Sequence, residues 1–224
     1  MKSFKYLDLI TAFFAVILLV SNITSSKIAA IGPFTLDGGT LLFPLSYILG
    51  DVLTEVYGYA RSRRVIWIGF GGLLLAMLTI MVVQKLPASP DWPGQEAYNA
   101  ILGLTPRIMI ASLIAYCAGE FSNSYLLAKL KLKTKGKFLW LRTISSTLVG
   151  QGIDTLLFVF IAFYGVFEAD VLKAIIISNY VFKVGIEVLF TPLTYLIVNR
   201  LKRAEHEDFY DNKTDFNPFQ LEGR

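Results

Sequence analysis

The sequence is poor in the residues that build metal centres and covalent active sites. It contains one cysteine, Cys117, and one histidine, His206. A single cysteine excludes an internal disulfide and a cysteine-based metal cluster, and Cys117 is expected to be a packed core residue within an apolar run. His206 is expected to be solvated in a polar tail. A phosphate-binding glycine loop and a nucleophile–base pair are also missing, so we predict no metal, no cofactor and no enzymatic activity, ATP hydrolysis included.

Charged residues are also scarce. They make up 17% of the chain, whereas 54% of it is hydrophobic, and the apolar residues gather into runs close to the length of a membrane-spanning helix. A soluble single domain is therefore disfavoured. The formal charge is +4, but the basic residues lie mostly at the edges of the apolar runs. They indicate membrane topology rather than binding to nucleic acid.

The apolar runs predict an all-α integral membrane protein that forms a six-transmembrane-helix bundle. The expected spans are residues 8–31, 38–59, 64–85, 105–130, 140–165 and 170–200. Between the first two spans, the pair Gly32-Pro33 and the run Asp37-Gly38-Gly39 favour turns and predict a short hairpin. Residues 94–104 predict a brief helix at the membrane interface.

The chain divides into two expected regions. Residues 1–203 form the transmembrane domain, and residues 204–224 form a flexible cytoplasmic tail, whose last four residues, 221–224, are compatible with a cloning remnant. The first apolar run lacks an obvious cleavage site and is expected to be a retained helix. The small size is compatible with a homodimer, and nothing in the sequence decides the oligomeric state.

The basic residues predict the orientation in the bilayer. If six spans alternate, most of them fall on one side: Lys2, Lys5, Arg61, Arg63, Arg64, the basic residues of 129–142, and those of 200–203. The opposite loops hold little more than Lys85, Arg107 and Lys173. The positive-inside rule therefore places both termini in the cytoplasm.

Seven charged residues lie within or near the ends of the expected spans: Lys27, Asp51, Glu55, Glu120, Asp154, Lys183 and Glu187. A charge at mid-membrane costs roughly 2.5 to 3.5 kcal/mol on insertion scales, so these side chains must face one another, a cavity or the interface. A structural ion pair explains Lys27, Glu55 and Glu187 as well as a functional role does. For Asp51, Glu120 and Asp154, a functional role is the favoured interpretation.

Helical spacing places many polar residues on shared faces, because residues three or four apart lie on the same side of a helix. The candidate binding residues are Asn22, Phe43, Tyr47, Asp51, Glu55, Glu120, Asn123, Gln151, Asp154, Asn179, Lys183 and Glu187. Carboxylates, amides and rings together predict a polar, partly aromatic cavity for a flat, hydrogen-bonding small molecule. The residues alone indicate a polar heterocycle or a small vitamin.

A short internal echo concerns the second and fifth spans. SYILG at residues 46–50 resembles STLVG at 146–150, and an acid follows each within four residues. Segments three spans apart have opposite orientations, which suits an inverted repeat of the kind that transporters use. Chance explains the echo equally well, because serine and glycine are common in membrane helices.

Residues 37–61, DGGTLLFPLSYILGDVLTEVYGYAR, closely resemble the signature of the queuosine precursor transporter family, formerly named for vitamin uptake. Further blocks resemble the family at residues 119–124, 142–147, 150–155 and 214–219. The resemblance implies a carrier in the bacterial inner membrane that imports 7-cyano-7-deazaguanine or its aminomethyl relative for making queuosine in tRNA. This substrate fits the residues themselves, and we expect Phe43 or Tyr47 to stack on its ring and Asp51, Glu120 or Asp154 to bind its guanidine-like edge.

Four hypotheses remain open at this point. The chain is a solitary secondary carrier, with proton coupling at a buried carboxylate, or it is the binding subunit of an ATPase-driven vitamin importer, whose six-helix plan is similar. An intramembrane enzyme is a third hypothesis, because paired acids also perform acid–base chemistry. A structural bundle without a ligand is the fourth, and it gives little reason to bury so many charges.

Overall fold

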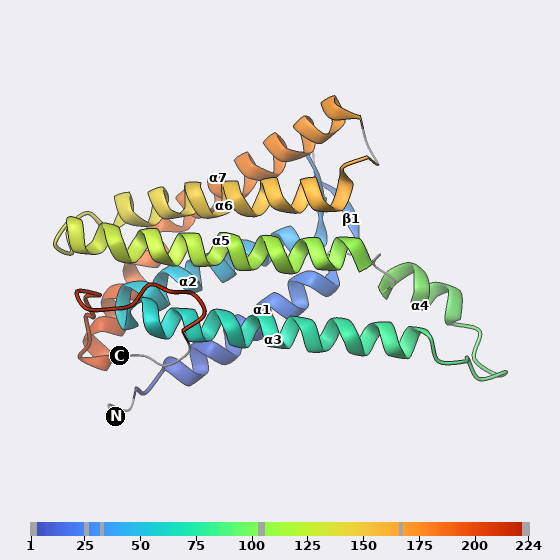
Figure 1. Ribbon diagram of the computed structural model, residues 1–224, viewed down its shortest axis with the longest axis horizontal. Coiled ribbons are helices and arrows are strands. Elements are labelled where there is room, and N and C mark those ends of the chain that lie inside the picture. Colours follow the sequence, from blue (N-terminus) through green and yellow to red (C-terminus); the bar gives the residue numbers. More distant parts are fainter. Residues whose placement is uncertain (1–3, 25–26, 32–33, 103–105, 166–167, 221–224) are drawn as a thin grey trace.

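The computed structural model describes residues 4–24, 27–31, 34–102, 106–165 and 168–220. Within these residues the chain is mostly helical (Figure 1). The helices are α1 (Leu7–Thr24), α2 (Phe43–Tyr57), α3 (Tyr59–Gln84), α4 (Gln95–Leu102), α5 (Pro106–Lys133), α6 (Leu139–Phe163) and α7 (Ala169–Glu205), with a 3-10 turn η1 (Gly38–Leu41). The last four residues of the sequence lie outside the described part of the chain.

A small antiparallel strand pair joins α1 to α2, where the sequence predicted a hairpin. Strand β1 (Ile28–Ile31) pairs with β2 (Phe34–Asp37). The predicted first span, 8–31, is therefore wrong at its end, because α1 ends at Thr24 and residues 28–31 form β1. The second predicted span, 38–59, begins too early. Its α-helix starts only at Phe43, with Pro44 in the first turn, where a missing N–H is tolerated.

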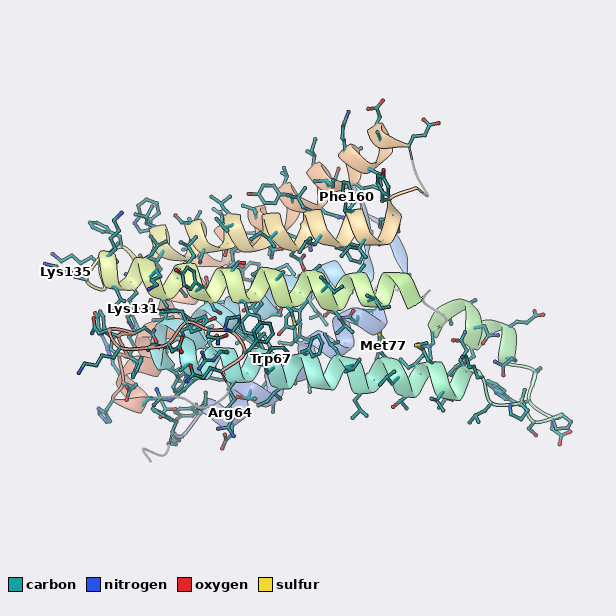
Figure 2. All side chains as sticks on the ribbon, in the orientation of Figure 1. Arg64, Trp67, Met77, Lys131, Lys135 and Phe160 are labelled. Carbon is teal, nitrogen blue, oxygen red and sulfur yellow. The ribbon has the colours of Figure 1, made fainter. Side chains whose placement is uncertain are left out.

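The long helices run side by side in alternating directions, so both chain termini lie at one end of the bundle and α4 lies at the other (Figure 1). Arg64, Lys131 and Lys135 lie near the end that carries the termini, and Met77 lies toward the opposite end (Figure 2). The end of the bundle that carries both chain termini is here called the terminal end. The alternating directions of the helices bring these basic residues to the same end of the bundle.

Four helices of the described residues are long and apolar enough to cross a membrane: Leu7–Thr24, Tyr59–Gln84, Leu139–Phe163 and Leu172–Glu205. The chain is thus a multi-pass membrane protein, but the predicted count of six spans is not confirmed. Helix α2 has 15 residues, which is about 22 Å of helix against a hydrocarbon core of about 30 Å. Helix α5 has 28 residues, but Glu120 and Asn123 interrupt its apolar run.

Helix α2 is the central helix of the bundle. From Pro44 to Tyr57 nearly all of its side chains are buried. Its apolar face, with Val52 and Leu53, packs against Phe14 and Leu18 of α1 and Ile66 of α3. Large apolar side chains of the outer helices are exposed instead, as lipid-facing residues are.

The segment after α7, which the sequence predicts to be a flexible tail, packs across the terminal end. Arg63 donates hydrogen bonds to the backbone carbonyls of Asp215, at 2.8 Å, and Asn217, at 2.5 Å. Trp67 Nε1 donates to the Pro218 carbonyl at 2.7 Å. The carboxylate of Asp211 accepts the backbone N–H of Tyr59 at 3.1 Å. Helix α7 also ends at Glu205, two residues beyond the predicted domain boundary.

Candidate functional site

Two clusters of buried polar side chains lie along the central helix α2. The first, here called the ion network, consists of Glu55, Lys131, Arg142, Lys202 and Asp208. The second, here called the acid cluster, consists of Asp51, Glu120, Asp154 and Glu187. Asp51 and Glu55 are one helical turn apart, so the clusters are neighbours along α2.

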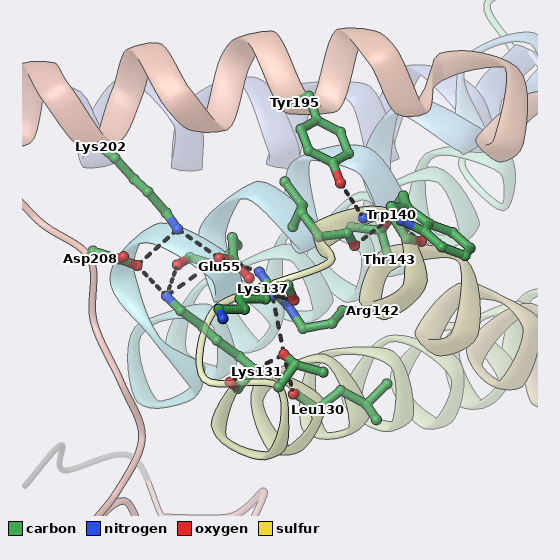
Figure 3. A network of polar contacts seen from close by, with 12 residues as sticks. Glu55, Leu130, Lys131, Lys137, Trp140, Arg142, Thr143, Tyr195, Lys202 and Asp208 are labelled. Atoms are coloured by element: carbon green, nitrogen blue, oxygen red, sulfur yellow. Dashed lines mark hydrogen bonds and ion pairs between the residues drawn. The ribbon is translucent and has the colours of Figure 1, made fainter.

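In the ion network, three basic side chains surround one fully buried carboxylate (Figure 3). Glu55 Oε1 lies 2.7 Å from both Arg142 Nη2 and Lys202 Nζ, and 3.5 Å from Lys131 Nζ. Its second oxygen, Oε2, has no hydrogen-bond partner among the described residues. The charge of Glu55 is nevertheless compensated by cations from three separate helices. The network therefore ties α2 to α5, α6 and α7.

Asp208 connects the segment after α7 to the same network. Its Oδ1 accepts hydrogen bonds from Lys131 Nζ at 2.5 Å and Lys202 Nζ at 2.9 Å. Partial burial alone would raise the pKa of Asp208, but the hydrogen bonds from the two lysines outweigh it and lower the pKa below its ordinary value. Asp208 is thus held ionised at neutral pH.

The acid cluster is formed by carboxyl groups from four helices, α2, α5, α6 and α7. Each of its four members is at most 3% exposed. Glu120 lies close enough to Asp51, Asp154 and Glu187 to interact electrostatically with all three. Because like charges repel strongly in a medium of low dielectric constant, such a grouping stays ionised only if positive charge compensates it, and protonation neutralises it otherwise.

One lysine compensates part of the acid cluster. Lys183 Nζ lies 2.7 Å from Asp154 Oδ2 and 4.5 Å from the centroid of the Phe43 ring. Asp51 accepts a hydrogen bond from the neutral amide of Asn123 at 2.7 Å. Over the described ranges, no salt bridge joins Asp51, Glu120 or Glu187 to a basic side chain.

Many buried polar atoms of α2, α5, α6 and α7, including atoms of the acid cluster itself, lack hydrogen-bond partners in the described part of the chain. They are Tyr47 Oη, Asp51 Oδ2, Tyr116 Oη, both carboxyl oxygens of Glu120, Asn123 Oδ1, Thr147 Oγ1, Gln151 Oε1 and Nε2, Thr155 Oγ1, and Glu187 Oε2. A buried polar group left without a partner costs about 1–3 kcal/mol. Such a concentration is typical of a site that binds a polar molecule.

Glycines make room for these side chains. A Cβ atom at Gly50 would overlap the carboxyl group of Glu120, and one at Gly119 would lie 2.5 Å from the hydroxyl of Tyr47. At Gly150 it would lie 2.8 Å from Cβ of Asn123. The two glycines of the sequence echo, Gly50 and Gly150, thus both face α5. The inverted repeat itself stays a prediction.

Comparison with known proteins decides the family. The model of the family described as "Putative vitamin uptake transporter" matches residues 37–197. The "Probable queuosine precursor transporter" of Bacillus subtilis is 32% identical over 177 residues, which cover 78% of this chain and 77% of the relative. The chain belongs to the queuosine precursor transporter family.

Two further relatives of the family extend the match. The "Queuosine precursor transporter" of Escherichia coli is 28% identical over 204 residues, which cover 89% of this chain and 90% of the relative. The "Probable queuosine precursor transporter" of Haemophilus influenzae is 28% identical over 170 residues, which cover 74% and 69% of the two chains. No solved structure matches the chain significantly.

As a member of a transporter family, the chain is not an enzyme. The buried acids of this family member are therefore to be interpreted through the binding of a solute and not through catalysis. The described residues also hold no group of three or more His, Cys, Asp or Glu side chains arranged to bind a metal ion.

The structure brings most of the predicted binding residues of this transporter together. Those in or beside the acid cluster are Phe43, Tyr47, Asp51, Glu120, Asn123, Gln151, Asp154, Lys183 and Glu187. Glu55 belongs to the ion network instead. Asn22 lies at the contact of α1 with α5, where Ser112 donates to it at 3.2 Å. Asn179 lies on α7 one turn before Lys183 and is partly buried.

Three polar residues at the site were missed by the sequence analysis: Tyr116, Thr147 and Thr155. Each is four residues from a predicted member, because Tyr116 precedes Glu120 and the two threonines flank Gln151. The same rule of helical spacing would have found them.

Proposed function

We propose that the protein imports a queuosine precursor, 7-cyano-7-deazaguanine or 7-aminomethyl-7-deazaguanine, for the synthesis of queuosine in tRNA. Membership of the family and the names of the relatives support the solute class. The observation that carries the proposal is the acid cluster with its unpartnered polar neighbours. A deazaguanine has several N–H donors, a carbonyl and a flat ring, which are the groups that such a site lacks.

The residues suggest how the base would be held. Phe43 and Tyr47 lie with ring centroids 5.8 Å apart and offer aromatic surface for the flat ring. Glu120, whose two carboxyl oxygens have no partner among the described residues, would accept two N–H groups from the guanidine-like edge. The side-chain amide of Gln151 has neither its N–H donor nor its oxygen acceptor paired among the described residues. Its N–H group would donate to the ring carbonyl.

We further propose that all six long helices cross a bacterial inner membrane. Helices α2 and α5 would cross inside a shield formed by the four apolar helices, because polar side chains at membrane depth are tolerated away from lipid. The terminal end carries Arg61, Arg64 and the lysines of residues 129–137, so the positive-inside rule places it in the cytoplasm. A homodimer is compatible with this arrangement.

Binding to the purified protein is the first test. Each deazaguanine should raise the thermal unfolding midpoint, whereas guanine and an unrelated vitamin should do so weakly or not at all. Vesicles that contain only this chain should then take up the solute without an ATPase, as a secondary carrier does. A protein that responds to neither deazaguanine would contradict the proposed solute. Binding without uptake would favour a subunit that depends on an ATPase.

A further inference from the structure

The acid cluster has more carboxyl groups than basic side chains. Its four carboxyl groups are all buried, and the lysine beside them, Lys183, is engaged with Asp154 at 2.7 Å. The ion network has the opposite excess, because Glu55 and Asp208 meet three basic side chains. The two neighbouring regions therefore differ in what they need from a ligand. Of the two, only the acid cluster holds carboxyl groups that form no salt bridge with a basic side chain of the described residues.

The unpartnered atoms point in the same direction. Six of them are oxygens of carboxyl or amide groups: Asp51 Oδ2, both Glu120 oxygens, Asn123 Oδ1, Gln151 Oε1 and Glu187 Oε2. Gln151 Nε2 is the one amide donor in the same group of atoms, and the hydroxyls of tyrosine and threonine can donate or accept. Apart from the hydroxyls, the set holds six oxygens and one N–H donor, so it suits a ligand that donates more hydrogen bonds than it accepts.

Glu187 and Asp51 form the part of the cluster best suited to an ammonium group. They come from different helices, α7 and α2, and interact electrostatically with each other. Each has one unpartnered carboxyl oxygen, and Glu187 is 1% exposed and Asp51 fully buried. A primary ammonium donates three hydrogen bonds and compensates charge, whereas a nitrile only accepts.

We infer that the acid cluster selects a ligand that carries a primary ammonium group, with Glu187 and Asp51 as its partners. The inference rests on the proposed function. It assigns a preference between the two precursors, the aminomethyl compound over the neutral cyano compound. Glu120 binds the edge that both compounds share, and Glu187 reads the group in which they differ.

The test compares the affinities of the two deazaguanines for the purified full-length protein by titration calorimetry. The aminomethyl compound should bind the native protein about tenfold more tightly, which is the ratio that one charge-assisted hydrogen bond supplies. Glu187→Gln keeps the size of the side chain and should remove most of that ratio. Glu120→Gln should weaken the binding of both compounds by the same factor. Glu96→Gln, on the exposed surface of α4, removes a carboxylate elsewhere and should change neither affinity.

Equal affinities in the native protein, or tighter binding of the cyano compound, would overturn the selectivity and leave the proposed function standing. An unchanged ratio in Glu187→Gln would overturn the role of Glu187. If neither compound bound the native protein, the proposed function would fail and this inference with it. Retention of a sharp thermal unfolding transition shows that each variant is folded, so that a lost ratio is read as lost selectivity.

Discussion

Asp51 and Glu55 lie one turn apart on the same buried helix, yet their surroundings differ completely. Glu55 meets cations from α5, α6 and α7, two of them at 2.7 Å. Asp51 accepts a hydrogen bond from the neutral amide of Asn123 and lies within electrostatic range of the carboxyl groups of Glu120 and Glu187. Burial of a charge is therefore a poor sign of function by itself. The informative difference is whether the protein supplies the compensating charge.

The largest effect is expected from Glu55→Gln, because it leaves three basic side chains without their shared carboxylate. Breaking a buried ion pair from one side costs about 3–5 kcal/mol. The thermal unfolding midpoint in detergent should fall strongly, and the exposed substitution Glu96→Gln should leave it unchanged. If the two variants unfolded at the same temperature, the structural role assigned to Glu55, in contrast to Asp51, would be wrong.

Glu120→Gln should show the reverse pattern. The structure offers no cation to Glu120 within the described residues, so stability should stay the same or rise. Binding of either deazaguanine should weaken by about 1.5–3 kcal/mol, the contribution of hydrogen bonds to a charged group. The comparison would break if this variant unfolded as early as Glu55→Gln and kept its affinity.

Gly50→Ala tests whether Glu120 needs its present position. The added Cβ would overlap the Glu120 carboxyl group, and overpacking of this kind costs about 1–3 kcal/mol. We expect weaker ligand binding and a lower unfolding midpoint. Gly72→Ala is the matched control, because a Cβ there meets nothing within 4 Å. Glu120→Asp is one methylene shorter and should restore part of the lost affinity in the double variant, and a lack of rescue would speak against a direct clash.

The smallest effect is expected from Asp208→Asn at the edge of the ion network. The side chain is 43% exposed, so solvent screening limits the stabilisation to about 0.5 kcal/mol. Because the folded pKa is lowered, this contribution is present above the unfolded pKa of about 3.9 and is lost as the pH falls through the folded pKa. The midpoints of native protein and variant should differ slightly at pH 7 and converge in acid. A gap that persisted in acid would point to a cause other than ionisation.

Much of the helical plan and most residues of the candidate site could be predicted from the sequence. Apolar runs marked the outer helices, and spacing of three or four marked the shared faces of α5 and α6, where Glu120, Asn123, Gln151 and Asp154 lie. These signals are local, because a helix repeats its faces every few residues. The same spacing predicted that Tyr47 and Asp51 share one face of α2.

The remaining features depend on contacts between distant segments. Arg142 and Lys202 were interpreted as markers of topology, and nothing local shows that both reach Glu55. The segment after α7 docks through backbone carbonyls, as at Asp215 and Asn217. Every residue has a backbone carbonyl, so the sequence cannot show which ones are used. The early end of α1 was missed because the residues of β1 are as apolar as a membrane helix.

The most direct test of the contrast between the two clusters is an experimental structure of the protein with 7-aminomethyl-7-deazaguanine bound. The account predicts the base between α2, α5, α6 and α7, with its guanidine-like edge at Glu120, its ammonium group at Glu187, and the ion pairs of Glu55 intact. A base bound against Glu55, with the carboxyl groups of the acid cluster far from it, would contradict the account.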